Sequence, residues 1–245
     1  LGSAQDGCGP FNCMPVKAIT RYKDEIYISW TNTTIGGGII VNGVARWDNT
    51  TWKPVGNDPI SEYATVVNFV EHEEQLFMIG SIRVTVDQDT AIAVIKWDGE
   101  KWENLYFPES IYGNPLPSTV CWYQGDMYIG GDLFFDINDT NYILDIAYLD
   151  HVDHTWKPVA EGIKGGLWHG ITDMVVFKGE LYVCGLFRKI DGNVGNKIMR
   201  WNGQQWNDVG GGICDINGTV HKMKVHDGKL YIVGIFSCVG DGIPA

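Results

Sequence analysis

The chain has 245 residues and a net charge of −12, and 44% of its residues are hydrophobic. This composition fits a folded chain with a packed core and excludes a disordered one. An acidic chain without a Lys/Arg cluster repels phosphate backbones and anionic lipid, so nucleic acid is not an expected partner. No apolar run approaches the roughly 20 residues that span a bilayer, so membrane insertion is not expected.

In chain order, one strand pattern returns five times, with an aromatic residue at its centre. The five anchors are Tyr27, Phe77, Tyr128, Tyr182 and Tyr231. An apolar strand and a tight turn precede each anchor, as at Asp227-Gly228, which is a strong hairpin signal. The spacing of about 50 residues is the length of a kelch-like repeat.

The second half of each repeat predicts another hairpin. It carries two tryptophans four residues apart around a polar turn: Trp47 and Trp52, Trp97 and Trp102, Trp201 and Trp206. The third copy departs from this pattern and keeps only Trp156. We expect the tryptophan pairs to hold the outer hairpin together. Four strands per repeat predict an all-β fold, a β-propeller of four-stranded blades.

The repeats are predicted near 15–57, 63–107, 117–160, 170–213 and 218–245, so the propeller spans 15–245. The last repeat lacks its tryptophan hairpin, and the N-terminal segment 1–14 contains nothing that resembles it. Either the chain continues past Ala245 or the ring closes with an unusual partner. The sequence favours the first alternative, a larger protein.

The repeat motif carries a family resemblance. Its two halves, L-Y-h-h-G-x-F (h, hydrophobic) and h-x-R-W-[DN]-G-x-x-W, are similar to the kelch-like repeats of galactose-oxidase central domains. Such repeats are common in secreted bacterial propellers, among them Bacteroidota proteins exported by the type IX system. The resemblance implies the fold and a secreted or cell-surface location. The kelch di-glycine is partial here, complete at Gly130-Gly131, and no copper-ligand set of galactose oxidase can be matched.

Six cysteines indicate an oxidising, extracytoplasmic location. The loop from Cys8 to Cys13 suits a local disulfide. Cys214 precedes the first strand of the last repeat and Cys238 follows its second strand, so antiparallel pairing predicts a Cys214–Cys238 disulfide. Cys121 and Cys184 lie within strands and are expected to be buried thiols.

Neither a catalytic nor a metal site is predicted. No local catalytic motif is present, and His151 and His154 are interpreted as surface histidines. Cofactors are not expected, although Ca²⁺ stays open for oxygen-rich loops. Those loops carry Asp87 and Asp89, Asp136, Asn138 and Asp139, Asp191 and Asn193, and Asp241.

Two loops between repeats carry aromatic residues suited to binding: Tyr112 in one, and Trp168 with His169 in the other. Their rings suit stacking on sugars or anchoring a protein, and packing between blades is the alternative. The predicted function is therefore a protein- or glycan-binding or scaffold module. A carbohydrate-active enzyme and a structural spacer in a surface adhesin or secretion cargo stay open as alternatives.

Overall fold

The computed structural model describes residues 16–29, 34–35, 39–41, 43–56, 65–86, 89–105, 116–138, 141–164, 170–215 and 217–244. These residues form β-strands joined by turns, with one short 3-10 helix at Lys189–Asp191, so the all-β prediction is confirmed. The chain divides into two compact units, residues 1–107 and 108–245. Among the described residues, no helix is long and apolar enough to cross a membrane.

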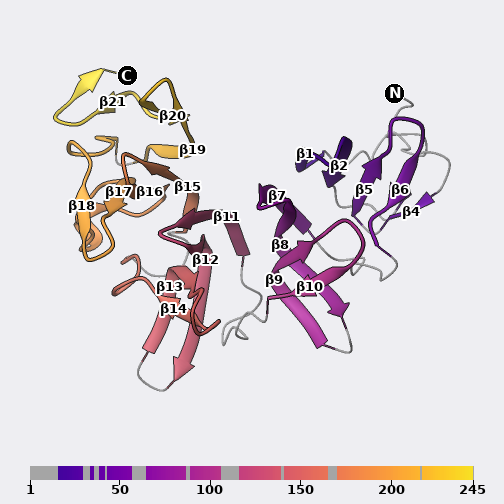
Figure 1. Ribbon diagram of the computed structural model, residues 1–245. Helices are drawn as coiled ribbons and strands as arrows, with labels where there is room; N and C mark the ends of the chain where they lie inside the picture. The colour runs from indigo at the N-terminus through magenta and orange to yellow at the C-terminus, as the bar shows by residue number, and fades with distance from the viewer. Residues whose placement is uncertain are drawn as a thin grey trace. The chain divides into compact units, whose positions relative to one another are not determined.

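Unit 1, residues 1–107, contains two four-stranded antiparallel sheets and a small hairpin (Figure 1). The first sheet, repeat 1, has the order β1-β2-β5-β6: β1 (Ala18–Tyr22), β2 (Glu25–Ser29), β5 (Val44–Trp47) and β6 (Trp52–Pro54). The hairpin is β3 (Thr34–Ile35) with β4 (Ile39–Ile40). Repeat 2 follows in chain order: β7 (Thr65–His72), β8 (Gln75–Val86), β9 (Asp89–Trp97) and β10 (Trp102–Asn104).

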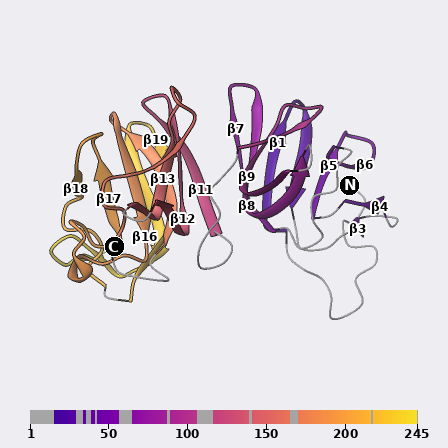
Figure 2. The same ribbon diagram turned by 90° about the horizontal axis from the view of Figure 1, so that it is seen from below.

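Unit 2, residues 108–245, contains repeats 3, 4 and 5. In repeat 3, β11, β12 and β13 run side by side (Figure 2). Its strands are β11 (Leu116–Tyr123), β12 (Asp126–Asn138), β13 (Asn141–Leu149) and β14 (Trp156–Pro158). Repeat 4 comprises β15 (Ile171–Phe177), β16 (Glu180–Gly185), β17 (Ile198–Trp201) and β18 (Trp206–Asp208). Repeat 5 pairs β19 (Thr219–His226) with β20 (Lys229–Ile235), and β21 (Cys238–Val239) pairs with β22 (Ile243–Pro244).

The first strands of successive repeats contact each other within each unit, β1 with β7, and β11 with β15 with β19. Serine and threonine side chains join these repeats by donating to a backbone carbonyl of the next one. Ser29 Oγ donates to Val66 O at 2.8 Å, and Thr172 Oγ1 donates to Val220 O at 2.6 Å. The first strands of repeats 2 to 5 each carry a register shift at the same place, beside these contacts.

The cores lie between consecutive repeats. Between repeats 1 and 2, the rings of Tyr22 and Tyr27 pack with Trp97 and Trp102. Between repeats 3 and 4, Tyr123 and Tyr128 pack in the same way with Trp201. The predicted tryptophan pairs are in contact, with ring centroids 5.3 Å apart for Trp47–Trp52, 4.7 Å for Trp97–Trp102 and 5.2 Å for Trp201–Trp206. The outer hairpins of repeats 1, 2 and 4 therefore pack their two tryptophans together, as the sequence predicts.

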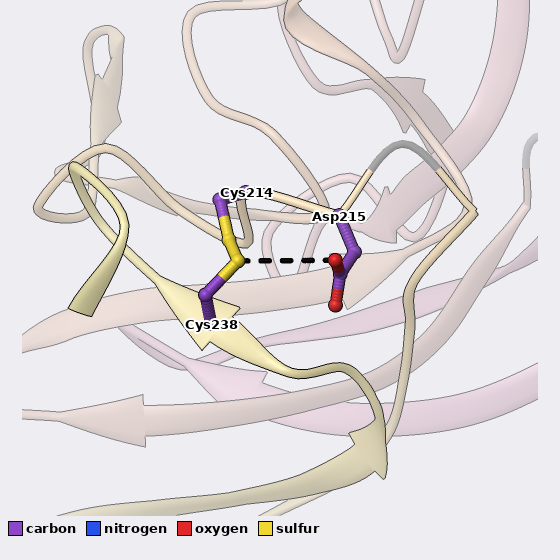
Figure 3. Close-up of side chains that lie close together, drawn as sticks. All are labelled: Cys214, Asp215 and Cys238. Atoms are coloured by element: carbon purple, nitrogen blue, oxygen red, sulfur yellow. Dashed lines mark hydrogen bonds between the residues drawn. A yellow bond between two sulfur atoms is a disulfide. The ribbon is translucent and has the colours of Figure 1, made fainter. Parts of the chain in front are cut away.

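The predicted Cys214–Cys238 disulfide is confirmed, with the two Cα atoms 5.6 Å apart (Figure 3). The carboxylate of Asp215 lies beside it, 3.8 Å from the sulfur of Cys238. Ser237 Oγ donates to the same carboxylate at 2.9 Å. The bridge holds the β21–β22 hairpin against the start of repeat 5.

Candidate functional site: a pocket beside an outer tryptophan hairpin

Repeats 1 and 3 end in short strands that carry the same motif, W-K-P-V. Repeat 1 has Trp52-Lys53-Pro54-Val55-Gly56, and repeat 3 has Trp156-Lys157-Pro158-Val159-Ala160. Gly56 and Ala160 both have left-handed backbone angles, with φ of 76° and 51°. The two positions are therefore equivalent in conformation and differ by one methyl group.

A tryptophan of the next repeat, Trp102, packs directly on the backbone of Val55 and Gly56, and we call this contact surface the tryptophan seat. Trp102 is 5% exposed, and its Nε1 donates to Val55 O at 3.3 Å. A Cβ on residue 56 would overlap the Trp102 indole at Nε1. Glycine is thus required here twice, once for φ and once for the close approach of the ring.

At the equivalent place in unit 2, the ring of Trp206 makes no such hydrogen bond to the backbone of Val159. Val159 O accepts instead from Gly162 N at 3.0 Å. Trp206 is only half-buried, and its buried Nε1 has no hydrogen-bond partner in the described structure. Ala160 and Trp206 line a cavity of about 340 Å³. Ala160 carries a methyl group at the position where Gly56 leaves room for an indole, and Ala160 and Trp206 line a pocket in place of the direct contact between Gly56 and Trp102.

The pocket has a rigid wall. Asn193, 8% exposed, joins the loop after β16 to the loop after β14. Its Nδ2 donates to Lys164 O at 2.7 Å and to Arg188 O at 3.0 Å, and its Oδ1 accepts from Lys164 N at 2.9 Å. Arg188 in turn makes a two-bond ion pair with Asp191, at 2.9 and 3.0 Å. The pocket shape is therefore held by hydrogen bonds before any ligand enters.

The lining combines an aromatic ring with exposed polar side chains. Gln204 and Gln205 line it from the turn before Trp206, and Asn202 Oδ1 accepts from both backbone N–H groups at 2.9 Å. Glu161 and Lys164 line the opposite loop and pair at 2.9 Å. The lining thus offers an indole, amide donors and acceptors, and a balanced charge pair. This set suits an uncharged polar ligand that has an apolar face.

The site residues predicted from the sequence are not among those that line this pocket in the described structure. Tyr112, Trp168 and His169 lie outside the described residues, as do Cys8 and Cys13. The pocket was missed, although its signal is visible in the sequence as alanine in place of glycine after the W-K-P-V motif. That signal acquires meaning only once the tryptophan of the next repeat is known to sit there.

The predicted surface histidines and oxygen-rich loops can be placed in part. His151 is exposed, with Nδ1 2.6 Å from Asp126 Oδ1, and His154 is exposed. His151, Asp126 and Asp150 could together face one cation, but Lys157 Nζ already lies 2.7 Å from Asp150. The loop pair Asp191 and Asn193 is used internally, as described above. Asp241 is exposed; the side chains of the other oxygen-rich positions lie outside the described structure.

The two thiols of the described strands differ in burial. Cys184 is buried, and burial raises its pKa to about 12. Cys121 is only half-buried, which corrects the expectation for that residue, and burial raises its pKa to about 11. Neither thiol is activated as a nucleophile, because a reactive cysteine needs a lowered pKa.

No protein-family model matches the chain, and no curated protein matches its sequence. Among solved structures, the chain is similar to the crystal structure of the computationally designed Ika8 protein, at 8% identity and a TM-score of 0.48. The match covers 89% of this chain and 55% of that one, so the chain spans about half the length of that protein. A likeness at this level carries no argument about fold or function.

Proposed function

We propose that the protein is a β-propeller of kelch-like blades, secreted or on the cell surface, that binds a neutral glycan in the pocket beside Trp206. The repeated four-stranded sheets and the contacts between their first strands support the propeller arrangement. The Cys214–Cys238 disulfide supports an oxidising location. The observation that carries the function is the pocket that Ala160 opens against Trp206.

The chemistry of the lining favours a sugar over other ligands. An indole packs well on the apolar face of a pyranose ring, while amides and hydroxyls pair around its edge. At about 340 Å³ the pocket is near the lower end of ligand pockets, roughly 300–1,000 Å³, which suits one sugar unit at the end of a chain. The net charge of −12 disfavours acidic glycans.

Binding fits this pocket better than hydrolysis. Glycoside hydrolysis needs two carboxyl groups flanking the bond to be broken. Of the residues that line the pocket in the described structure, Glu161 alone carries a carboxylate, and that carboxylate is paired with Lys164. The alternative of a carbohydrate-active enzyme, and that of a structural spacer, both lack a comparable supporting observation.

The test is an array of neutral and acidic mono- to tetrasaccharides, with hits titrated by calorimetry against wild type and Ala160→Gly. Glycine accepts the φ of 51° without strain, so this variant keeps the fold and lets Trp206 close onto residue 160. We expect a neutral oligosaccharide to bind wild type and the variant to lose at least about tenfold in affinity. Equal binding by both proteins, or binding of acidic sugars alone, would contradict the proposal.

Two further variants test the polar rim of the same pocket. Gln204→Ala and Gln205→Ala remove amides without touching the Trp201–Trp206 contact, because both side chains are exposed. Each should weaken binding by the loss of one hydrogen bond, about 0.5–1.5 kcal/mol, and leave the unfolding temperature unchanged.

A further inference from the structure

Repeat 5 leaves an open groove of about 630 Å³ beside repeat 4. One wall is formed by Phe177, Tyr182, Ile198 and Val209 of repeat 4, and the other by Leu230 and Ile232 of β20. The residues equivalent to Leu230 and Ile232 are buried in repeats 2, 3 and 4, as Leu181 and Val183 are in repeat 4. In repeat 5 both side chains are only half-buried.

The two complete interfaces show what fills the same place. Between repeats 1 and 2, the wall formed by Tyr22, Tyr27, Val44 and Val55 is covered by Trp97 and Trp102. Between repeats 3 and 4, the equivalent wall of Tyr123, Tyr128, Ile146 and Val159 is covered by Met199 and Trp201. In each case the cover is the outer hairpin of the later repeat. The described part of repeat 5 has no such hairpin.

The groove also contains an empty tryptophan seat. Val209-Gly210 follows the same short strand as Val55-Gly56, and Gly210 has a φ of 58°. A Cβ on Gly56 would overlap Trp102, whereas a Cβ on Gly210 would meet nothing within 4 Å. Gly210 lines the groove. The glycine and its left-handed backbone are present, and the ring is missing. Val209 O accepts from Gly212 N at 2.9 Å and keeps a second lone pair for an indole N–H.

The edge of the groove is an unpaired strand. In repeat 4, β16 pairs with β15 on one side and β17 on the other, with Leu181 opposite Trp201. Among the described residues, β20 pairs only with β19. Its free backbone groups form a template for one further antiparallel strand. A strand added in the register of β17 would place its tryptophan opposite Leu230, at the groove.

We infer that this groove is a docking site for a β-hairpin carrying two tryptophans four residues apart. The hairpin pairs with the free edge of β20, inserts its first ring between Tyr182 and Leu230, and seats its second ring on Gly210. A second copy of this chain is a poor donor. Its hairpins already pair within their own sheets, and Trp97, Trp102 and Trp201 are buried there. The hairpin therefore comes from polypeptide other than the described residues.

The test uses a labelled, backbone-cyclised peptide with the sequence of residues 197–208, which contains Trp201 and Trp206. Cyclisation is needed because an isolated hairpin is only marginally stable. Its binding to the full 245-residue chain is measured by fluorescence anisotropy, next to a control peptide with both tryptophans replaced by alanine. Hydrogen exchange of β20 gives an independent readout of strand pairing.

Two protein variants separate the seat from backbone strain. Gly210→Ala blocks the seat, and Gly242→Ala imposes at least as much backbone strain, at a φ of 94° where a Cβ also meets nothing, outside the groove. We expect saturable binding that protects β20 amides, a loss of about tenfold or more with the control peptide and with Gly210→Ala, and no change with Gly242→Ala.

Three results would overturn the inference: no binding of the tryptophan hairpin, equal binding of both peptides, or equal weakening by the two variants. A stable dimer of the chain that the hairpin cannot dissociate would assign the edge to a second copy and would also overturn it.

Discussion

Asp145 is a buried carboxyl group at a position where no other repeat has an acidic residue. It is 6% exposed, has a φ of 62°, and lies at the position of Gly43 in repeat 1 and Lys197 in repeat 4. Burial raises its pKa to about 7, a hydrogen bond from Leu133 N at 3.3 Å opposes this, and the nearby Asp132 adds to it. The native protein therefore holds a proton that the unfolded chain releases.

This proton predicts a pH dependence of stability. The unfolded carboxyl releases its proton near pH 4 and the folded one near pH 7, so the native state binds more protons between these values. The contribution of Asp145 to the free energy of unfolding should therefore be largest below about pH 4. It should fall by up to about 1.4 kcal/mol per pH unit as the pH rises to 7. Above pH 7 this contribution is constant.

Asp145→Asn isolates the effect, because asparagine tolerates a positive φ and does not titrate. The difference in unfolding free energy between the variant and wild type, measured in urea from pH 5 to 8, should grow with pH in favour of the variant. A difference that does not change with pH would show that Asp145 is ionised in the native protein.

Gly56 gives a second prediction at this scale. Gly56→Ala strains a φ of 76° and overlaps the Trp102 indole, so it should lower the unfolding free energy by about 2–4 kcal/mol. Ala160→Gly, its mirror substitution in unit 2, should cost less than about 1 kcal/mol. Chemical denaturation of both variants checks this, and similar losses in both would remove the basis for the pocket.

At the scale of the elements, Asp173 joins three first strands. Its carboxylate, on β15, accepts a hydrogen bond from Thr119 Oγ1 of β11 at 3.2 Å. It also accepts from two groups of β19, Met223 N at 2.7 Å and Lys222 Nζ at 3.3 Å. It is 7% exposed. Asp173→Ala should lower the unfolding free energy by about 2–3 kcal/mol, because it leaves the buried Met223 N–H without an acceptor.

Asp153→Ala is the matched control for Asp173→Ala. Asp153 also pairs with a lysine, Lys157, and accepts from Thr155 N at 3.0 Å, but its side chain is 49% exposed and water can replace it, so the change should stay within about 1 kcal/mol. Equal losses in the two variants, measured by urea unfolding, would show that Asp173 does not connect the strands.

The Cys214–Cys238 disulfide is a second link between elements. Replacing Cys214 and Cys238 by serine opens a loop with a sequence separation of 24, which should cost about 3 kcal/mol. The loss should be accompanied by faster hydrogen exchange at Val239, which bridges to Ile213 beside the bond. An unchanged unfolding free energy, with exchange at Val239 also unchanged, would contradict this role.

The sequence predicts the hairpins well because their signals are local. Each hairpin is recognised from fewer than ten consecutive residues, by a turn such as Asp227-Gly228 or by the spacing of two tryptophans. The Cys214–Cys238 disulfide follows from the predicted pairing of the two strands between them. The third repeat departs from the repeat motif in its sequence, yet its outer turn is closed by a hydrogen bond from Asp150 N to Thr155 O at 3.0 Å. The bulges, the role of Asp173 and the pocket could not be predicted, because each depends on contacts between repeats.

At the scale of the whole molecule, one contact rule explains both cavities. Repeats 1, 3 and 4 have a left-handed residue after their fourth strand, and a tryptophan of the next repeat, Trp102 or Trp206, lies at the first two of these. Glycine with tryptophan closes the interface, as at Gly56. Alanine with tryptophan leaves the pocket at Ala160, and glycine without tryptophan leaves the groove at Gly210.

The central claim is that the pocket beside Trp206 binds ligand. The most direct measurement is NMR of the ¹⁵N-labelled tryptophan indole groups, titrated with the best neutral oligosaccharide from the array. We predict that the Trp206 signal shifts most and the Trp201 signal less, that the Trp102 signal is unchanged, and that Ala160→Gly abolishes the shift. A titration in which Trp206 stays unmoved while another indole responds would contradict it.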